Sequence, residues 1–276
     1  MEKSAFRTII FCDLFQFLIF FLLYISVNKF FFGIQSVVLR AGRSVFSFFA
    51  GGSECVVCGN DSGLLPVCTD CRKKFFAVKP AGVGVCKFCG KELISEDGVC
   101  MECRKGVLMK HLDGAFPLFS YRLWNTSLLC RWKMEDERIF SDFFAELMNE
   151  RLSQICKIKG EFVVVPVPPR PGKIKTKGWD QVDEISQILE FRYNWNVKRI
   201  LQRHTDVQQK TLERTQRMEM IGKAYSLNAD VKVVPEVVCL VDDVLTTGST
   251  IESCAEKLKE SGCKKVFAVA LFSVDR

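Results

Sequence analysis

The sequence predicts an α/β protein: a doubly wound parallel sheet preceded by an N-terminal four-cysteine metal module. Three observations lead to this prediction. Short apolar runs in the second half of the chain alternate with helical patterns, as expected for strands buried on both faces. Eight cysteines form four Cys-x-x-Cys pairs between positions 55 and 103. An acidic pair and a hydroxyl-rich loop directly follow one of the apolar runs.

Length and composition limit the possible classes of protein. The chain has 276 residues, enough for a core domain and one accessory module. A hydrophobic fraction of 48% with 26% charged residues excludes a wholly disordered chain. The net charge of +7 permits binding of phosphates or nucleic acid without requiring it. Since only two histidines occur, mechanisms based on clusters of histidine ligands are disfavoured.

The N-terminal segment allows three interpretations. Residues 1–32 form a hydrophobic extension, and 33–54 are expected to form a helix leading into the metal module. Residues 8–27 are long and apolar enough for a membrane span, but Asp13 lies within them, where a carboxylate is costly. The segment is therefore a membrane anchor, an amphipathic or core-docking helix, or an extension from a misplaced start codon. An anchor would tether an otherwise cytoplasmic protein to the inner membrane.

The cysteines of residues 55–106 predict a metal module with an internal duplication. The second set repeats the first after 31 or 32 residues, and a glycine follows each leading pair. Two Cys-x-x-Cys pairs supply the four thiolates of a closed structural zinc site. The predicted ligands of two structural Zn²⁺ ions are Cys55, Cys58, Cys68 and Cys71, and Cys86, Cys89, Cys100 and Cys103. Disulfides, an iron–sulfur cluster and interleaved pairing are the alternatives.

A phosphate site is predicted near the C-terminus. Residues 237–241 are an apolar run typical of a parallel strand, and Asp242 and Asp243 follow at its carboxyl end, where such sheets bind ligands. A helix is expected over 249–261, ended by Gly262. Its N-terminus and the preceding amides would bind a phosphate. The loop residues are Thr246, Thr247, Gly248, Ser249 and Thr250. A turn without a ligand is the alternative.

A second predicted anion-binding element lies upstream. A strand over 162–165 is followed by a basic loop and by a helix expected over 182–191. The residues suited to a pyrophosphate are Lys177, Gly178 and Gln181. A solvated charged loop is the alternative.

The remaining patterns complete the predicted sheet. Strands are expected near 115–121, 197–201 and 265–272. Asp136 and Glu137 are interpreted as a solvated helix start. Six apolar residues at helical spacing should face the core: Phe140, Phe143, Phe144, Leu147, Met148 and Leu152.

The acidic pair and its loop resemble the phosphoribosyl-pyrophosphate (PRPP) motif of type I phosphoribosyltransferases. Together with the cysteine pairs and the Gly178-x-x-Gln181 helix start, the chain from about residue 33 resembles the ComF family. The resemblance implies a phosphoribosyltransferase-like domain over 112–276. It implies that Asp242 and Asp243 contact the ribose hydroxyls, that residues 246–250 hold the 5′-phosphate, and that Mg²⁺ arrives with PRPP. Members are implicated in natural transformation, acting on cytoplasmic single-stranded DNA.

Three positions bear on this resemblance. Asp180 stands where the family has an asparagine, and its charge is expected to weaken anion binding. Met220 also replaces an asparagine, whereas Lys133 matches a family lysine of undefined role.

Three functions follow from these patterns. The first is a binding protein with a PRPP or nucleotide-phosphate site, acting in DNA uptake with single-stranded DNA and DNA-processing proteins as partners. In that case, basic clusters with aromatics at 72–76 and 177–179 would contact the DNA. The second is an active phosphoribosyltransferase with an unknown acceptor, and the third is a membrane-tethered scaffold.

Overall fold

The structure is a computed structural model that describes residues 54–63, 65–94, 96–106, 109–121, 124–204 and 224–274. The predicted extension 1–32, the run 8–27 and nearly all of the predicted helix 33–54 lie outside these ranges. Within them, no helix combines the length and apolar character needed to cross a bilayer. The chain divides into two compact units, Met1–Leu64 and Leu65–Arg276. All helices and strands described below belong to the second unit.

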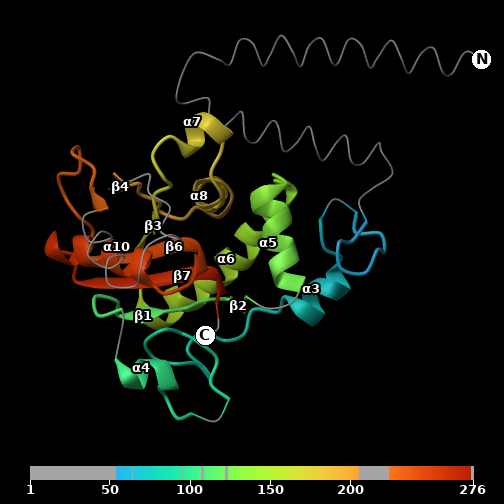
Figure 1. Ribbon diagram of the computed structural model, residues 1–276, viewed down its shortest axis with the longest axis horizontal. Helices are drawn as coiled ribbons and strands as arrows, with labels where there is room; N and C mark the ends of the chain where they lie inside the picture. The colour runs from blue at the N-terminus through green and yellow to red at the C-terminus, as the bar shows by residue number, and fades with distance from the viewer. Residues whose placement is uncertain are drawn as a thin grey trace, which may run out of the picture. The chain divides into compact units, whose positions relative to one another are not determined.

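Seven helices and seven strands make up the described part of this unit (Figure 1). The helices are α3 (Thr69–Phe75), α4 (Met101–Lys105), α5 (Trp124–Met134), α6 (Ile139–Lys159), α7 (Lys173–Lys177), α8 (Gln181–Tyr193) and α10 (Ser249–Glu260). The strands are β1 (Gly114–Ala115), β2 (Phe119–Ser120), β3 (Val163–Pro166), β4 (Leu201–Arg203), β5 (Tyr225–Leu227), β6 (Val237–Leu245) and β7 (Lys265–Ser273).

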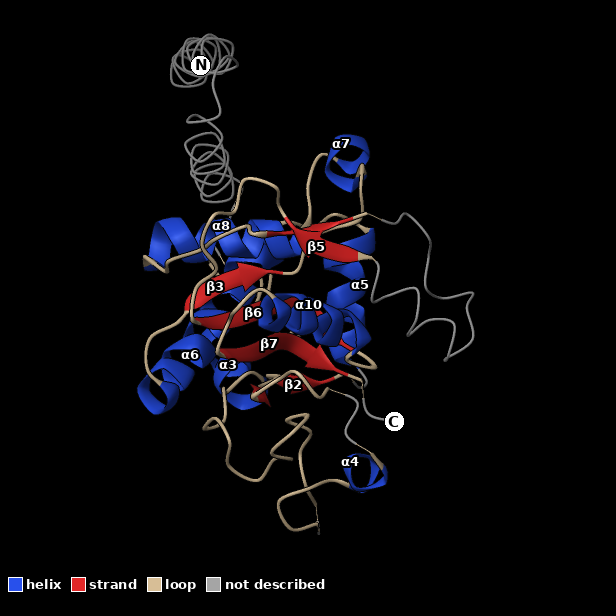
Figure 2. Cartoon of the chain, turned by 90° about the vertical axis from the view of Figure 1, so that its left-hand side faces the viewer, coloured by secondary structure: helices blue, strands red, loops and turns tan. Residues whose placement is uncertain are grey.

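The central sheet is parallel, with strand order β1-β7-β6-β3, and β2 also pairs with β7 (Figure 2). The β6–β7 ladder runs from Val237 opposite Lys265 to Leu245 opposite Ser273. Both strands are buried over most of their length, which explains why their sequences lack polar alternation. The sheet confirms the predicted α/β class and fits a phosphoribosyltransferase-like fold.

Helices cover both faces of this sheet. Helix α10 contacts β6 and β7 from one side, while α6 contacts β7 and α8 contacts β3 and β6 (Figure 2). All six predicted core residues of α6 are at most 1% exposed. Complete burial of such side chains contributes roughly 1.5–3 kcal/mol each. The stripe therefore fixes α6 against the sheet, as predicted.

Two predicted strands differ from the structure. The segment 115–121 forms two short strands, β1 and β2, separated by Pro117, which cannot donate to a ladder. In the segment 197–201, only Val197 pairs with the central sheet, through one bridge to Val164. Leu201 instead begins β4, which pairs antiparallel with β5 in a separate two-stranded sheet. Only the first residue of β4 is fully buried, a pattern that suits a sheet covered on one face.

Candidate functional site

The second four-cysteine group is a compact tetrad. All sulfur pairs among Cys86, Cys89, Cys100 and Cys103 lie within 4.8 Å. A tight turn carries the leading pair, since the Gly90 amide donates to the Cys86 carbonyl at 2.9 Å with Gly90 at φ +70°. The sulfurs of Cys89 and Cys100 are 3.7 Å apart. A tetrahedron with Zn–S bonds of about 2.3 Å has edges of about 3.8 Å, so the spacing fits zinc.

The chemistry of these thiols also fits a cation. Burial raises the pKa of Cys89 to about 12, and the neighbouring sulfurs of Cys86 and Cys100 add to the shift. Four adjacent thiolates are therefore unfavourable without a positive ion between them. Cys86, Cys89, Cys100 and Cys103 are free thiols, which disagrees with the disulfide alternative for this group. A zinc ion held by four cysteines would have no open position, so its role would be structural.

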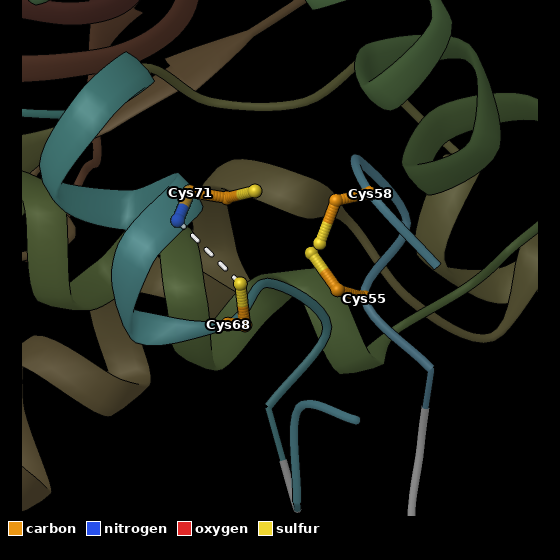
Figure 3. A group of neighbouring side chains, drawn as sticks. All are labelled: Cys55, Cys58, Cys68 and Cys71. Atoms are coloured by element: carbon orange, nitrogen blue, oxygen red, sulfur yellow. Dashed lines mark hydrogen bonds between the residues drawn. The ribbon is translucent and has the colours of Figure 1, made fainter. Parts of the chain in front are cut away.

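The first group repeats the arrangement. The sulfurs of Cys55, Cys58, Cys68 and Cys71 also lie within 4.8 Å of one another (Figure 3). Cys68 is the N-cap of α3, and its sulfur accepts a hydrogen bond from the Cys71 amide at 3.5 Å. The cysteines are thus grouped consecutively, as predicted, and interleaved pairing is not observed.

The acidic pair lies within β6 near its carboxyl end, because the strand continues to Leu245 instead of ending at residue 241 as predicted. Both Asp242 and Asp243 are half-buried, and the Asp243 amide donates to the Asp242 carboxylate at 2.8 Å. The Lys133 ammonium lies 2.5 Å from the Asp243 carboxylate. Desolvation lowers the pKa of Lys133, but the carboxylates of Asp243 and Asp242 outweigh it and raise this pKa above its usual value. Lys133 is therefore the cation that partly neutralises the pair.

Asp242 is electrostatically unfavourable as a carboxylate. Burial raises the pKa of Asp242 to about 8, and the charge of Asp243 contributes. Because the folded-state pKa exceeds the unfolded value of about 3.9, the free energy of unfolding should be highest below pH 4 and should fall as pH rises toward 8. An acid that costs stability at neutral pH is typical of a binding or catalytic site.

The predicted phosphate loop connects β6 to α10. Gly248, at φ +79°, is the N-cap residue of α10, and its carbonyl accepts from the Glu252 amide at 2.7 Å. The Thr247 hydroxyl accepts from the Ser249 amide at 3.1 Å and lies 2.5 Å from the Ser249 hydroxyl. The first amides of α10 have no carbonyl partner one turn earlier, and the helix dipole is positive here. This geometry suits an anion.

The segment after the second cysteine group contacts this loop directly. Met109 is 6% exposed, and its sulfur would lie 2.5 Å from a Cβ atom at Gly248. The amides of Lys110 and His111 donate to the Glu252 carboxylate at 2.9 and 3.2 Å. A cavity of about 80 Å³ lies beside these contacts, lined by Cys89 and Cys103 and by residues 245–248. The tetrad and the loop are therefore neighbours in one unit.

The structure brings the two predicted anion elements together through Lys133. Its carbonyl accepts from the Lys177 ammonium at 2.5 Å and from the Gln181 amide at 3.5 Å, while its own ammonium contacts Asp243. Gly178 ends α7 in the left-handed conformation at φ +81°. The sequence indicated Lys177, Gly178 and Gln181 but not the role of Lys133. A lysine directly after the buried Trp132 was the available signal.

Two charged residues differ from their sequence interpretations. The Asp180 side chain caps α8 by accepting from the amides of Val182 and Asp183, both at 3.0 Å, and it pairs with Lys173 at 2.5 Å. Its charge is thus offset rather than facing an anion site alone. Asp136, which has φ +56°, pairs with Lys177 at 2.7 Å. It is exposed, as predicted, but it does not start a helix, because α6 begins at Ile139.

The remaining residues singled out in the sequence differ in their exposure, and one of them is not described. Glu137 pairs with Arg131 at 2.8 Å. In the two basic clusters predicted to contact DNA, the Phe76 and Trp179 rings are buried, whereas Phe75 is 38% exposed. Met220 lies outside the described residues.

Comparison with known proteins gives two relatives. The chain is 26% identical over 227 residues to competence protein ComFC of Streptococcus pneumoniae, covering 79% of this chain and 92% of the relative. It is 25% identical over 209 residues to competence protein F of Haemophilus influenzae, covering 72% and 87%. No protein-family model matches the chain. The chain, with its α/β sheet and two cysteine tetrads, is therefore similar in sequence to these two competence proteins over most of its length.

Proposed function

We propose that the protein binds PRPP, or a related ribose 5-phosphate, at residues 242–250 and acts in competence. The observation that carries the proposal is the placement of an acidic pair near the carboxyl end of β6, whose connection to α10 is the short loop that ends at Gly248. Vicinal hydroxyls donate hydrogen bonds to carboxylates, and helix N-termini bind phosphate. A ribose 5-phosphate offers both groups.

In this proposal each residue has a defined task. Asp242 and Asp243 accept hydrogen bonds from the ribose diol, and the amides of 246–250 with their hydroxyls hold the 5′-phosphate. The diol donates hydrogen bonds to Asp243 and so replaces part of its contact with Lys133. The Lys133 ammonium is then available for a pyrophosphate. Mg²⁺ would arrive bound to the pyrophosphate oxygens and neutralise part of their charge.

The proposed role in DNA uptake rests on the names of the two relatives and on exposed cations. Lys73 and Lys74 are exposed on α3 beside Phe75, and the Lys74 ammonium lies 5.2 Å from the Phe75 ring centroid. Cations beside an exposed aromatic ring suit single-stranded DNA, whose bases stack and whose phosphates pair with lysine. Arg170 and Lys175 add exposed charge at the basic loop.

A second candidate function is phosphoribosyl transfer. An acceptor nucleophile would attack the anomeric carbon, the bond from that carbon to the pyrophosphate oxygen would break, and pyrophosphate would leave with the electron pair. The observation favouring turnover is that Lys133 contacts Asp243 while its carbonyl accepts from the Lys177 ammonium, since cations there would stabilise the departing anion.

Calorimetric titration tests the proposal. Mg-PRPP and a single-stranded oligonucleotide are titrated into wild type, Asp242→Asn and Asp243→Asn. The titrations are made above pH 8, where Asp242 is ionised. We expect each variant to bind PRPP at least about tenfold more weakly there, because each loses charged hydrogen bonds to the diol. Asp230→Asn removes an exposed carboxylate outside the site and serves as the matched control.

The controls separate lost binding from lost folding. Asp242→Asn should unfold at the same temperature as wild type or higher at pH 8, since it removes an unfavourable charge. Absence of PRPP binding by the folded wild type would refute the ligand site. Pyrophosphate release in the presence of candidate acceptors would favour the transferase, whereas salt-sensitive oligonucleotide binding without release would favour the binding protein.

A further inference from the structure

A second cavity lies away from the phosphate loop, at the β1–β2 edge of the sheet. Its volume is about 210 Å³, well above the roughly 10–15 Å³ needed by one water. The chain from Ala115 to Ser120 forms one wall, residues of the second cysteine module form another, and Arg151 of α6 contributes a side chain. Its ionisable lining has three cations (Lys79, Lys91 and Arg151) and two acids (Glu92 and Glu96).

Arg151 is the unusual member of this lining. It is 5% exposed, and its Nε atom has no hydrogen-bond partner among the described residues. Its other contacts are long bonds to neutral oxygens, at 3.3 Å to the Gln154 side chain and 3.5 Å to the Pro117 carbonyl. Burial alone lowers the pKa of Arg151 to about 10, so it stays charged at neutral pH. A buried charge without a counterion is costly.

The neighbouring acids do not supply that counterion. Glu92 pairs with Lys79 at 2.5 Å, on exposed side chains. Among the described residues, no carboxylate lies within ion-pair distance of Arg151, although other buried or half-buried arginines have one. Arg72 and Arg138, for example, contact glutamates at 2.5 and 2.7 Å. The contrast indicates that the partner of Arg151 is not among the described residues.

The groups that line the cavity indicate what kind of partner it binds. An added peptide strand would need regular donors along the β1–β2 edge, and Pro117 has no N–H to offer. A planar guanidinium instead binds carboxylate or phosphate oxygens two at a time. We propose that this cavity binds a small-molecule oxyanion, a carboxylate or phosphate, through Arg151. The site is separate from the proposed ribose-phosphate site and does not depend on it.

Titration with two simple probes tests this inference. Inorganic phosphate and acetate are titrated at constant ionic strength into the zinc-loaded full chain, with chloride as the reference anion. Arg151→Met is compared with Arg192→Met, which removes the same charge from a side chain that is 62% exposed. We expect Arg151→Met to bind at least one probe about tenfold more weakly or worse, and Arg192→Met to behave as wild type.

A variant of the phosphate loop distinguishes binding at the two anion sites. Ser249→Asp places a carboxylate at the start of α10 and should exclude phosphate there while leaving the Arg151 site intact. Probe binding that survives Ser249→Asp and is lost in Arg151→Met supports the inference. Equal titrations of Arg151→Met and Arg192→Met, or complete loss of probe binding in Ser249→Asp, would overturn it.

A spectroscopic measurement covers the case in which Arg151→Met does not fold. Protein labelled with ¹⁵N-arginine gives separate Nε–H signals, and Arg151→Lys assigns the one from Arg151. A shift of that signal with phosphate or acetate, in wild type and in Ser249→Asp, supports the site. A signal that does not move with either probe contradicts it.

Discussion

The two cysteine tetrads have nearly the same local backbone but different surroundings. In the first, the Cys55 amide donates to the Asn60 carbonyl at 2.7 Å, and in the second the Cys86 amide donates to Lys91 at 2.7 Å. Antiparallel bridges close both turns, Glu54 with Asp61 and Val85 with Glu92. The N-caps of α3 and α4 agree to within 1° in φ and ψ. The duplication read from the cysteine spacing is therefore a structural repeat.

The helices that follow the tetrads contact different parts of the domain. Arg72 of α3 pairs with Glu146 and Glu150 of α6, at 2.9 and 2.5 Å. Phe76 packs edge-to-face on Phe119 and Phe143. By contrast, α4 has no buried residue. In the chain after it, Met109 lies against Gly248 and the Lys110 amide donates to Glu252 of α10. One ligand set thus supports the core, and its repeat supports the candidate site.

Removing each metal separately would give the largest effect. Cys68→Ser/Cys71→Ser and Cys86→Ser/Cys89→Ser should each reduce the zinc content from two ions to one, measured by elemental analysis. Structural zinc contributes on the order of 10 kcal/mol to its site, so each local module should unfold. We expect only Cys86→Ser/Cys89→Ser to weaken Mg-PRPP binding strongly, since Met109 would no longer fix the loop. Equal weakening by both variants would contradict the division of roles.

Alanine substitutions of the two turn glycines, Gly59 and Gly90, form a matched pair with a smaller expected effect on stability. Gly59 and Gly90 have φ of +75° and +70°, so alanine at either costs about 1–2 kcal/mol in conformation. A Cβ at Gly90 would lie 2.3 Å from the Ala115 carbonyl oxygen, whereas a Cβ at Gly59 meets no described atom within 4 Å. Gly90→Ala should therefore cost about 1–3 kcal/mol more than Gly59→Ala in denaturant unfolding. Equal costs would show that the module is not seated against β1.

The arginines that follow the two trailing cysteine pairs, Arg72 and Arg104, should give the smallest difference in the free energy of unfolding. Arg72 pairs with two glutamates, while the Arg104 side chain donates to the Val99 carbonyl at 3.0 Å. We expect Arg72→Met to lower the free energy of unfolding by about 1–2 kcal/mol and Arg104→Met by less than about 0.5 kcal/mol. Urea unfolding of the zinc-loaded chain measures both. A larger loss for Arg104→Met would reverse the comparison.

The sequence predicted the parts of the site that are local in the chain. Cysteine spacing gave the correct tetrads, because each ligand pair sits on one short turn. The run from Val237 into the loop gave β6 and α10, because burial on both faces leaves a clear apolar signature. The capping role of Asp180 was not predicted, although aspartate before a helix is a common N-cap.

Contacts between distant segments could not be predicted in this way. Lys133 and Asp243 come from α5 and β6, and nothing in either local pattern specifies the other. The same holds for Lys177, which could have faced solvent but contacts Asp136 and the Lys133 carbonyl. The departure of β4 from the central sheet was missed because a short apolar run near residue 200 fits either sheet.

The contact between Met109 and Gly248 constrains how relatives of this protein can diverge. Residue 248 must adopt a positive φ, and any side chain there would also meet the Met109 thioether. Accommodating a β-carbon would require a shorter residue at 109 as well as tolerance of the strained backbone. These two positions, far apart along the polypeptide, should therefore covary as a single steric unit across homologues.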